Sequence, residues 1–210
     1  MVEGLIGKKI GMTQIFDADG KIVPVTILKV GPCVVVQKKT VAIDGYEKVQ
    51  LGYVDQKKKV KANKPMEGHF KKANVPPTSK LQEFAYSGDS DALKVGDNIL
   101  LGDIFAIGTY VNVIGKSKGR GFQGVIKRHG FGGGKATHGS MFHRAPGSIG
   151  ASASPSRVLP GMKNPGQMGS VKVNIQDLEV IDIDVENNLL LVKGSVPGSR
   201  DSFVTVIKAF

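Results

Sequence analysis

The feature that most constrains this chain is a long segment without any acidic residue. Residues 104–176 contain ten Lys or Arg and no Asp or Glu, whereas the rest of the 210-residue chain has 19 basic and 18 acidic residues. Nearly all of the net charge of +11 therefore lies in this segment, which we call the basic window. The window also holds 15 of the 28 glycines, and from about residue 129 to 169 it shows no helix or strand periodicity. Irregular loops of this length are uncommon in compact domains and are usually functional or disordered.

The absence of carboxylates favours a surface that lies against phosphates. A solvated linker gains solubility from charge of either sign, so a linker does not explain why acids are excluded. A carboxylate placed against a phosphate backbone would be repelled, which does explain it. Basic proteins of this size usually meet nucleic acid or an anionic membrane. The window lacks an amphipathic Lys/Arg-rich helix, so the membrane alternative is disfavoured and nucleic-acid binding is predicted.

The sequences on both sides of the window have the pattern of short strands. Residues Asp17–Gly20 and Glu186–Asn188 are predicted to be turns between them. Strands are predicted at residues 22–28, 34–36, 49–54, 110–114, 181–185, 189–192 and 203–207. Many short strands at this spacing predict a closed barrel or a sandwich. One short helix is predicted after Asn63 or Lys64, with Pro65 in its first turn, and another from about Phe122 to Arg128.

The predicted fold is mainly β with minor α content and has two parts. Residues 1–114 and 170–210 are expected to form a β-barrel domain, with a small helical insertion near residues 63–84. Residues 115–169 are expected to form a basic, glycine-rich extension that is disordered alone and ordered by its partner. Forty residues that run out and back reach on the order of 60 Å, at ~3.3 Å per residue.

Two glycine-rich motifs in the window resemble nucleotide-binding loops but lack required residues. Gly119–Gly124 matches G-x-G-x-x-G, yet the next acid is Asp177 and no βαβ alternation follows, whereas a carboxylate about 20 residues later is needed. The run Gly130–Ala136 resembles a P-loop, but His129 and Ala136 replace the first glycine and the Ser or Thr. A nucleotide- or flavin-binding enzyme is therefore the disfavoured alternative, and no cofactor is expected.

The titratable residues of the window do not form a catalytic or metal site. His129, His138 and His143 have no cysteine or carboxylate among them, and the last two are not at helical i, i+4 spacing. A general acid–base pair usually needs a carboxylate that orients its partner, and the window contains none. We predict no catalytic residue and no metal, so the chain is not expected to be an enzyme.

The remaining composition is typical of a cytoplasmic protein. The single cysteine, Cys33, excludes an internal disulfide and is expected to be buried. The N-terminal residues have neither a signal-peptide nor a transit-peptide pattern. No stretch approaches the roughly 20 apolar residues that span a bilayer.

The candidate RNA-binding residues are the cations and histidines of the window. They are Lys116, Lys118, Arg120, Lys127, Arg128, His129, Lys135, His138, His143, Arg144, Arg157, Lys163 and Lys172. Phe122, Phe131 and Phe142 are interleaved with them and either stack on bases or pack the root of the loop. A second cluster, Lys57–Lys59 with Lys61 and Lys64, fits a solvated surface as well as it fits an RNA contact.

Six stretches of the sequence together resemble one protein family. They are Leu5–Thr13, Asn63–Phe70, Ser117–Val125, His138–Gly150, Gly166–Gly169 and Leu191–Gly198. In combination these motifs are specific, cover nearly the whole chain and are similar to the bacterial-type members of the universal L3 family of large ribosomal subunit proteins.

This resemblance implies a six-stranded barrel like that of translation elongation factors, with a long, irregular, basic internal loop. It implies binding to 23S-type ribosomal RNA, early subunit assembly, and a loop that reaches towards the peptidyl transferase centre. The implied neighbours are ribosomal proteins L14 and L19, with no membrane, small-molecule substrate or homo-oligomer. The loop tip of the family maps onto Gly147, Ser148, Ile149, Gly150, Ala151, Ser152, Ala153, Ser154 and Pro155.

The sequence departs from the family pattern at two positions. Ala153 stands where some bacterial relatives carry a methylated glutamine, so that modification cannot occur here. Lys135 stands where relatives often have proline, which adds a cation and loosens the turn.

Overall fold

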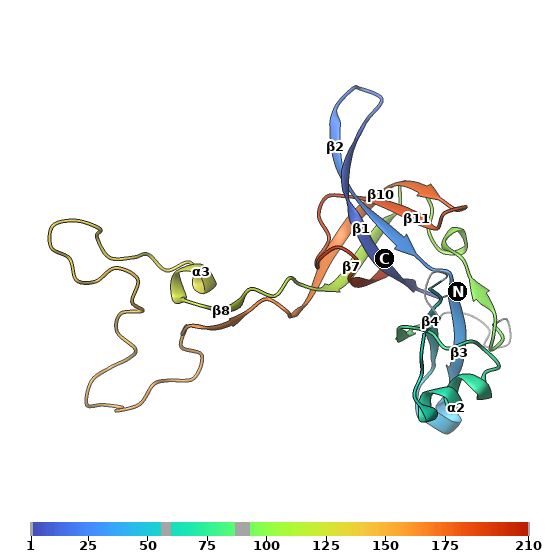
Figure 1. Cartoon of the computed structure of the whole chain (residues 1–210), viewed down its shortest axis with the longest axis horizontal. Coiled ribbons are helices and arrows are strands. Elements are labelled where there is room, and N and C mark those ends of the chain that lie inside the picture. Colours follow the sequence, from blue (N-terminus) through green and yellow to red (C-terminus); the bar gives the residue numbers. More distant parts are fainter. Residues whose placement is uncertain (1, 56–59, 87–92, 210) are drawn as a thin grey trace. The chain divides into compact units, whose positions relative to one another are not determined.

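The computed structural model describes residues 2–55, 60–86 and 93–209 (Figure 1). It divides into two compact units: Met1–Lys116 with Lys172–Phe210, which we call the β unit, and Ser117–Val171, which we call the extension. Strands predominate and helices are short, so the predicted mainly β fold with minor α content is confirmed. No helix in the described part of the chain is long and apolar enough to cross a membrane.

Six antiparallel strands of the β unit close into a barrel (Figure 1). In ring order they are β1 (Gly4–Phe16), β12 (Phe203–Lys208), β7 (Tyr110–Lys116), β10 (Lys172–Asp184), β11 (Leu189–Lys193) and β2 (Ile22–Val30). The ring closes because β2 pairs with both β11 and β1. Fully buried aliphatic side chains such as Leu28, Val113 and Leu190 supply the core of these strands.

The strands between β2 and β7 form a separate four-stranded sheet instead of adding to the barrel. Its order is β5 (Leu81–Phe84), β4 (Lys48–Tyr53), β3 (Cys33–Lys39) and β6 (Asn98–Ile99). Two short helical turns also lie in this part of the chain, α1 (Val41–Asp44) and the 3-10 helix η2 (Leu101–Asp103). The predicted strands at residues 34–36 and 49–54 therefore belong to this sheet and not to the barrel.

The predicted helix after Asn63 is confirmed as α2 (Lys64–Lys72). The side-chain oxygen of Asn63 accepts a hydrogen bond from the backbone N–H of Met66 at 3.2 Å, and Pro65 lies in the first turn. Phe70 is buried against Val34 and Val36 of β3, which fixes the helix on the four-stranded sheet (Figure 1).

Three local predictions differ in part from the structure. The predicted second helix is present as α3, but it spans Val125–His129, and Phe122 lies in β8 (Gly121–Gln123). Val185 is 53% exposed and belongs to the turn that precedes β11, not to a half-buried strand. Within the predicted helical insertion near residues 63–84, the last four residues form β5. β8 and β5 pair with β9 and β4, which are distant in sequence, and local patterns do not report such pairing.

The longest missed strand is β1, whose glycines and lysines do not have a strand pattern. Gly4 and Gly7 of β1 are required by close strand packing rather than by a turn. A Cβ at Gly4 would collide with the carbonyl oxygen of Val206, and one at Gly7 would lie 2.9 Å from the carbonyl oxygen of Lys29. Glycine thus lets β1 sit between β12 and β2 and close the barrel.

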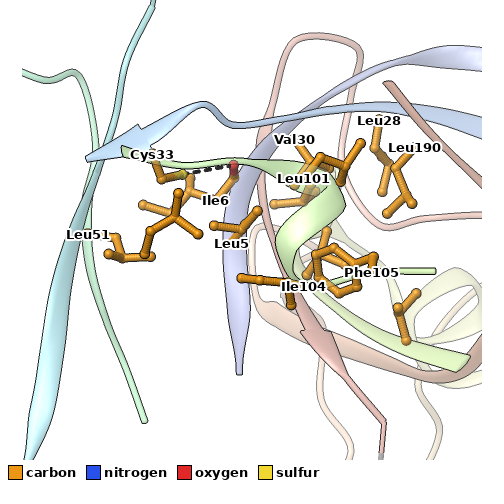
Figure 2. Packing of buried hydrophobic residues seen from close by; sticks show 14 of the residues in the cluster. Leu5, Ile6, Leu28, Val30, Cys33, Leu51, Leu101, Ile104, Phe105 and Leu190 are labelled. Carbon is orange, nitrogen blue, oxygen red and sulfur yellow. Dashed lines mark hydrogen bonds between the residues drawn. The ribbon is translucent and has the colours of Figure 1, made fainter. Parts of the chain in front are cut away.

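One hydrophobic core joins the barrel to the four-stranded sheet (Figure 2). Leu5 and Ile6 of β1 pack with Leu51 of β4, and Leu101 and Phe105 fill the space near Val30. The β unit is therefore a single folded body with two sheets around one core.

The thiol of Cys33 lies within this core, as the sequence predicted (Figure 2). It is fully buried and donates to the carbonyl oxygen of Ile6 at 3.6 Å. Burial raises the pKa of the Cys33 thiol to about 12, against 9.0 for an unburied thiol. The thiol therefore stays protonated at neutral pH and is a poor nucleophile.

Truncating the barrel core is expected to destabilise the whole β unit. We predict that Leu190→Ala lowers the free energy of unfolding by about 2–5 kcal/mol, because it removes buried methyl groups and leaves a cavity. Urea titration of the full chain measures this change. Ile22→Ala is the control: Ile22 is 58% exposed, and its loss is expected to cost about 0.5 kcal/mol or less. Equal effects of the two changes would contradict this core assignment.

Cys33 is expected to be inert in the native chain. At pH 8 a pKa of about 12 leaves roughly one thiol in 10,000 ionised, and burial blocks access to it. We predict that a maleimide or disulfide reagent labels the protein only after urea unfolding, as measured by mass spectrometry. Rapid labelling of the folded chain would show that the core around β3 opens readily.

Candidate nucleic-acid interface

The two legs of the extension are held together as a narrow antiparallel ribbon. β8 pairs with β9 (Gly166–Met168), and Ser117 is hydrogen-bonded to Val171, its N–H donating to the carbonyl oxygen at 2.9 Å. Gly169 has φ +74°, and a Cβ there would collide with the carbonyl oxygen of Lys118. Glycine at this position thus permits the close approach of the two legs.

Beyond the ribbon, α3 ties the outgoing leg to the returning leg through one carbonyl group. The Nη1 atom of Arg128 donates to the carbonyl oxygen of Asn164 at 2.7 Å, and Nε2 of His129 lies 3.0 Å from the same oxygen. A carbonyl oxygen only accepts, so this contact requires the His129 tautomer that carries hydrogen on Nε2. A Cβ at Gly166 would lie 2.5 Å from Nη1 of Arg128, so glycine there makes room for the guanidinium group. We call this arrangement the Asn164 clasp.

The clasp closes a loop that has no regular structure of its own. Residues 130–165 contain no helix or strand. Within the loop, the N–H of Gly134 donates to the carbonyl oxygen of His143 at 2.9 Å. A Cβ at Gly134 would overlap the carbonyl oxygen of Phe142, so this crossing of the backbone requires glycine. Residues 141–163 are exposed throughout, including the whole tip at Gly147–Pro155.

The predicted RNA-binding residues fall into three groups along this framework. Lys116 ends β7 and Lys172 begins β10, where the two are directly opposite each other. Lys118 and Arg120 lie between β7 and β8. These four cations form the first group. The second group, on α3, is Lys127, Arg128 and His129. The third group, on the loop, is Lys135, His138, His143, Arg144, Arg157 and Lys163.

The cations of the window are open to solvent and unpaired with acids. Nine of the ten cations of the window are exposed, and the tenth, Arg128, is half-buried. Among the residues that the structure describes, none of them forms an ion pair with a carboxylate. The structure thus places Lys116 and Lys172 side by side, while the loop cations are spread along a backbone without helix or strand.

The phenylalanine side chains of the window differ in solvent exposure. Phe122 is 74% exposed and Phe142 is 42% exposed, so both rings present surface to a partner. Phe131 is half-buried and lies against the ring of His129, with 6.0 Å between ring centroids. Of the second basic cluster, Lys57–Lys59 lie outside the described residues, and Lys61 and Lys64 are exposed.

The structural role of the clasp does not follow from the sequence. Arg128 and His129 are predicted to bind RNA, but their side chains also have an acceptor within the protein. Asn164 contributes only its backbone carbonyl, so no residue-type signal could have identified it.

The glycine motif Gly119–Gly124 does not adopt a dinucleotide-binding arrangement. It spans the leg before β8, β8 itself and the residue before α3, a helix of only five residues. β8 pairs with β9 in the antiparallel sense, whereas a dinucleotide fold requires a parallel βαβ unit. Among the described residues, no group of three His, Cys, Asp or Glu is placed to hold a metal ion.

An exposed, carboxylate-free basic extension on a folded β unit is the charge distribution of a nucleic-acid-binding protein. Comparison with known proteins shows the family. The sequence model of the family "Ribosomal protein L3" matches residues 78–185. The large ribosomal subunit protein uL3 of Solibacter usitatus is 55% identical over 206 residues, which are 98% of each chain. That of Geobacter sulfurreducens is 52% identical over 98% of this chain and 97% of its own. This chain therefore belongs to the ribosomal protein L3 family.

Family membership decides several of the predictions. The resemblance found in the sequence motifs is confirmed over nearly the whole chain. Proteins of this family are structural, so the prediction that the chain is not an enzyme is confirmed. A ribosomal, and hence cytoplasmic, location follows from the family as well.

The clasp is expected to stabilise the ribbon of the extension. We predict that Arg128→Gln costs about 1.5 kcal/mol, the lower end for a hydrogen bond with a charged donor, and speeds amide exchange in β8 and β9 by roughly tenfold. Hydrogen-exchange mass spectrometry of the full chain measures this change. Lys127→Gln is the matched control. Lys127 is exposed on the same helix, and its substitution removes the same charge as Arg128→Gln. Identical exchange in both variants would show that the clasp contributes nothing.

Proposed function

We propose that this chain is a structural constituent of the large ribosomal subunit whose extension binds 23S-type ribosomal RNA. The observation that carries the proposal is the series of ten cations with no carboxylate, nine of them exposed. In the absence of RNA these charges are balanced only by mobile counterions. Phosphates that replace those counterions release them into solution, and this release favours binding.

Charged and uncharged residues of the loop have different roles in the proposed RNA binding. The tip, Gly147–Pro155, contains no charged side chain, and Arg144 and Arg157 flank it. Small residues at the tip allow close approach to RNA, while the flanking cations hold the phosphates on either side. This pattern supports a tip that lies among RNA helices near the peptidyl transferase centre. Chemistry at that centre would belong to the RNA, and the tip would stabilise its geometry.

The finer expectations from the family are part of the same proposal. We infer a barrel of the translation-factor type, a role in early subunit assembly, and L14 and L19 as protein neighbours. The closed ring of six antiparallel strands supports the first of these. An extension that folds onto RNA would join segments of RNA before later proteins arrive, which supports the second. We also propose that the functional boundaries of the extension lie near residue 115, at the end of β7, and near residue 169, between β9 and β10.

The nucleotide- or flavin-enzyme alternative is not retained. The glycine motif that suggested it lies in an antiparallel ribbon, and the family is structural.

The salt dependence of RNA binding tests this proposal. Affinity for large-subunit RNA is expected to fall with salt at a slope of roughly −0.7 to −0.9 per phosphate contact in a log–log plot. If most of the ten cations make contacts, the full chain has a steep slope, and a slope near −1 would contradict the mechanism.

Cosedimentation with large subunits is expected for the full chain and is expected to be lost on deletion of residues 135–165.

Matched charge variants separate a specific interface from general attraction. One variant changes the four loop cations, Lys135, Arg144, Arg157 and Lys163, each to Gln. The other changes four exposed lysines of the β unit, Lys21, Lys71, Lys94 and Lys208, each to Gln. We expect the loop variant to make the slope shallower by roughly 3, because four contacts are lost. The β-unit variant is expected to leave it nearly unchanged, and equal effects would sink the proposal.

A further inference from the structure

A cavity of about 600 Å³ in the β unit lies where β12, β7 and the first residue of β10 meet the start of β5. Its lining includes the buried Val204 and Gly115 and the half-buried Leu81 and Phe203. Cavities of ~300–1,000 Å³ hold ligands of the size of a nucleotide. All of these residues belong to the β unit, so the cavity is a feature of that folded body alone.

The charges around this cavity are all positive. Lys80, Lys116 and Lys172 line it, and no carboxylate does. Three other cavities of the β unit differ in this respect. One contains Glu47, another contains Asp97 and Asp103, and the third contains Asp44. The cavity at β12 thus differs from these three in the charge of its lining.

The lysines of this cavity repel one another. Lys116 and Lys172 are directly opposite in the β7–β10 pair, an arrangement of like charges that destabilises a sheet. All three lysines are exposed, and none forms an ion pair within the described part of the chain. An anion placed between them would relieve this repulsion.

The uncharged polar groups of the lining also suit an anion. The hydroxyl of Thr205 donates to Oε1 of Gln82 at 2.8 Å. With its oxygen occupied as an acceptor, the amide of Gln82 offers its NH₂ group as a donor. Together with three ammonium groups, this makes a lining rich in donors above an apolar floor.

We propose that this cavity binds a nucleotide of ribosomal RNA, with its phosphate between Lys80, Lys116 and Lys172. The inference rests on the proposed function and adds a second contact site, on the β unit, that includes a lysine outside the basic window. RNA is favoured over an acidic protein segment because the cations continue along the chain from Lys116 through Lys118 to Arg120. A strand with a phosphate at every nucleotide matches such a series, whereas an isolated carboxylate does not.

Charge removal at Lys80 gives the first test. In the full chain, Lys80→Gln is expected to weaken binding to large-subunit RNA and to reduce the salt slope by roughly 0.7 to 0.9, the value of one phosphate contact. Lys21→Gln is the matched control, because Lys21 is exposed and its ammonium group lies 3.3 Å from the carboxylate of Asp19. An unchanged affinity and slope for Lys80→Gln would overturn the proposal.

Crosslinking identifies what occupies the cavity. Lys80→Cys introduces an accessible thiol, while the native Cys33 is buried and stays unlabelled. A photoreactive group attached to this thiol is expected to crosslink to RNA in large subunits that contain the labelled chain. Crosslinks to protein alone, or none, would overturn the proposal.

The two tests separate this inference from the proposed function. The unmodified chain can bind large-subunit RNA with a steep salt slope while Lys80→Gln leaves affinity and slope unchanged and the label on Lys80→Cys does not crosslink to RNA. In that case only the cavity assignment fails. If the unmodified chain shows no salt-dependent binding, the proposed function fails and the cavity assignment fails with it.

Discussion

The pairing of β7 with β10 is the constraint on which the arrangement of charge depends. These neighbouring strands of the barrel carry the chain into and out of the extension, so both ends of a 55-residue segment are fixed side by side. The register places Lys116 opposite Lys172, and the ribbon of β8 and β9 continues the antiparallel pairing. Cations from two distant parts of the sequence are thereby concentrated at one place, where mutual repulsion opposes folding unless an anion is present.

The rest of the molecule compensates for this repulsion in two ways. The β unit has a continuous core, from the barrel into the four-stranded sheet, that is independent of the extension. Within the extension, backbone hydrogen bonds and the Asn164 clasp hold the legs together without any ion pair. A carboxylate would be the simplest way to stabilise these cations, yet the window has none. The fold therefore keeps its positive charge available to a partner.

The sequence predicted those features that depend on local residue type. The β-branched run at Ile22–Val30, the cap at Asn63 and the burial of Cys33 follow from propensity, capping and hydrophobicity, and all three are present. The window of uniform charge also required only a residue count. Family motifs supplied the identification, since no local rule connects a basic loop to a particular ribosomal protein.

Other features depend on partners distant in sequence and could not be predicted in the same way. β1 lacks a strand pattern, and its Gly4 and Gly7 are explained only by the carbonyl groups of β12 and β2 that approach them. The clasp uses a backbone carbonyl at Asn164, which any residue could supply. Lys80 stands in a nearly neutral part of the sequence, and only the meeting of β5 with β12 places it beside the window's lysines.

Arg128 shows why charge alone does not define an interface of this kind. Its guanidinium group donates to Asn164 through Nη1, and the remaining N–H groups stay free to donate to a phosphate. The same side chain can thus fix the ribbon and contact RNA, whereas a lysine at this position could not present the same fixed fork of donors. Lys127 and Lys163, on either side of the clasp, are exposed. Arg128 therefore fixes the geometry of the extension at its root, while the neighbouring lysines contribute exposed positive charge.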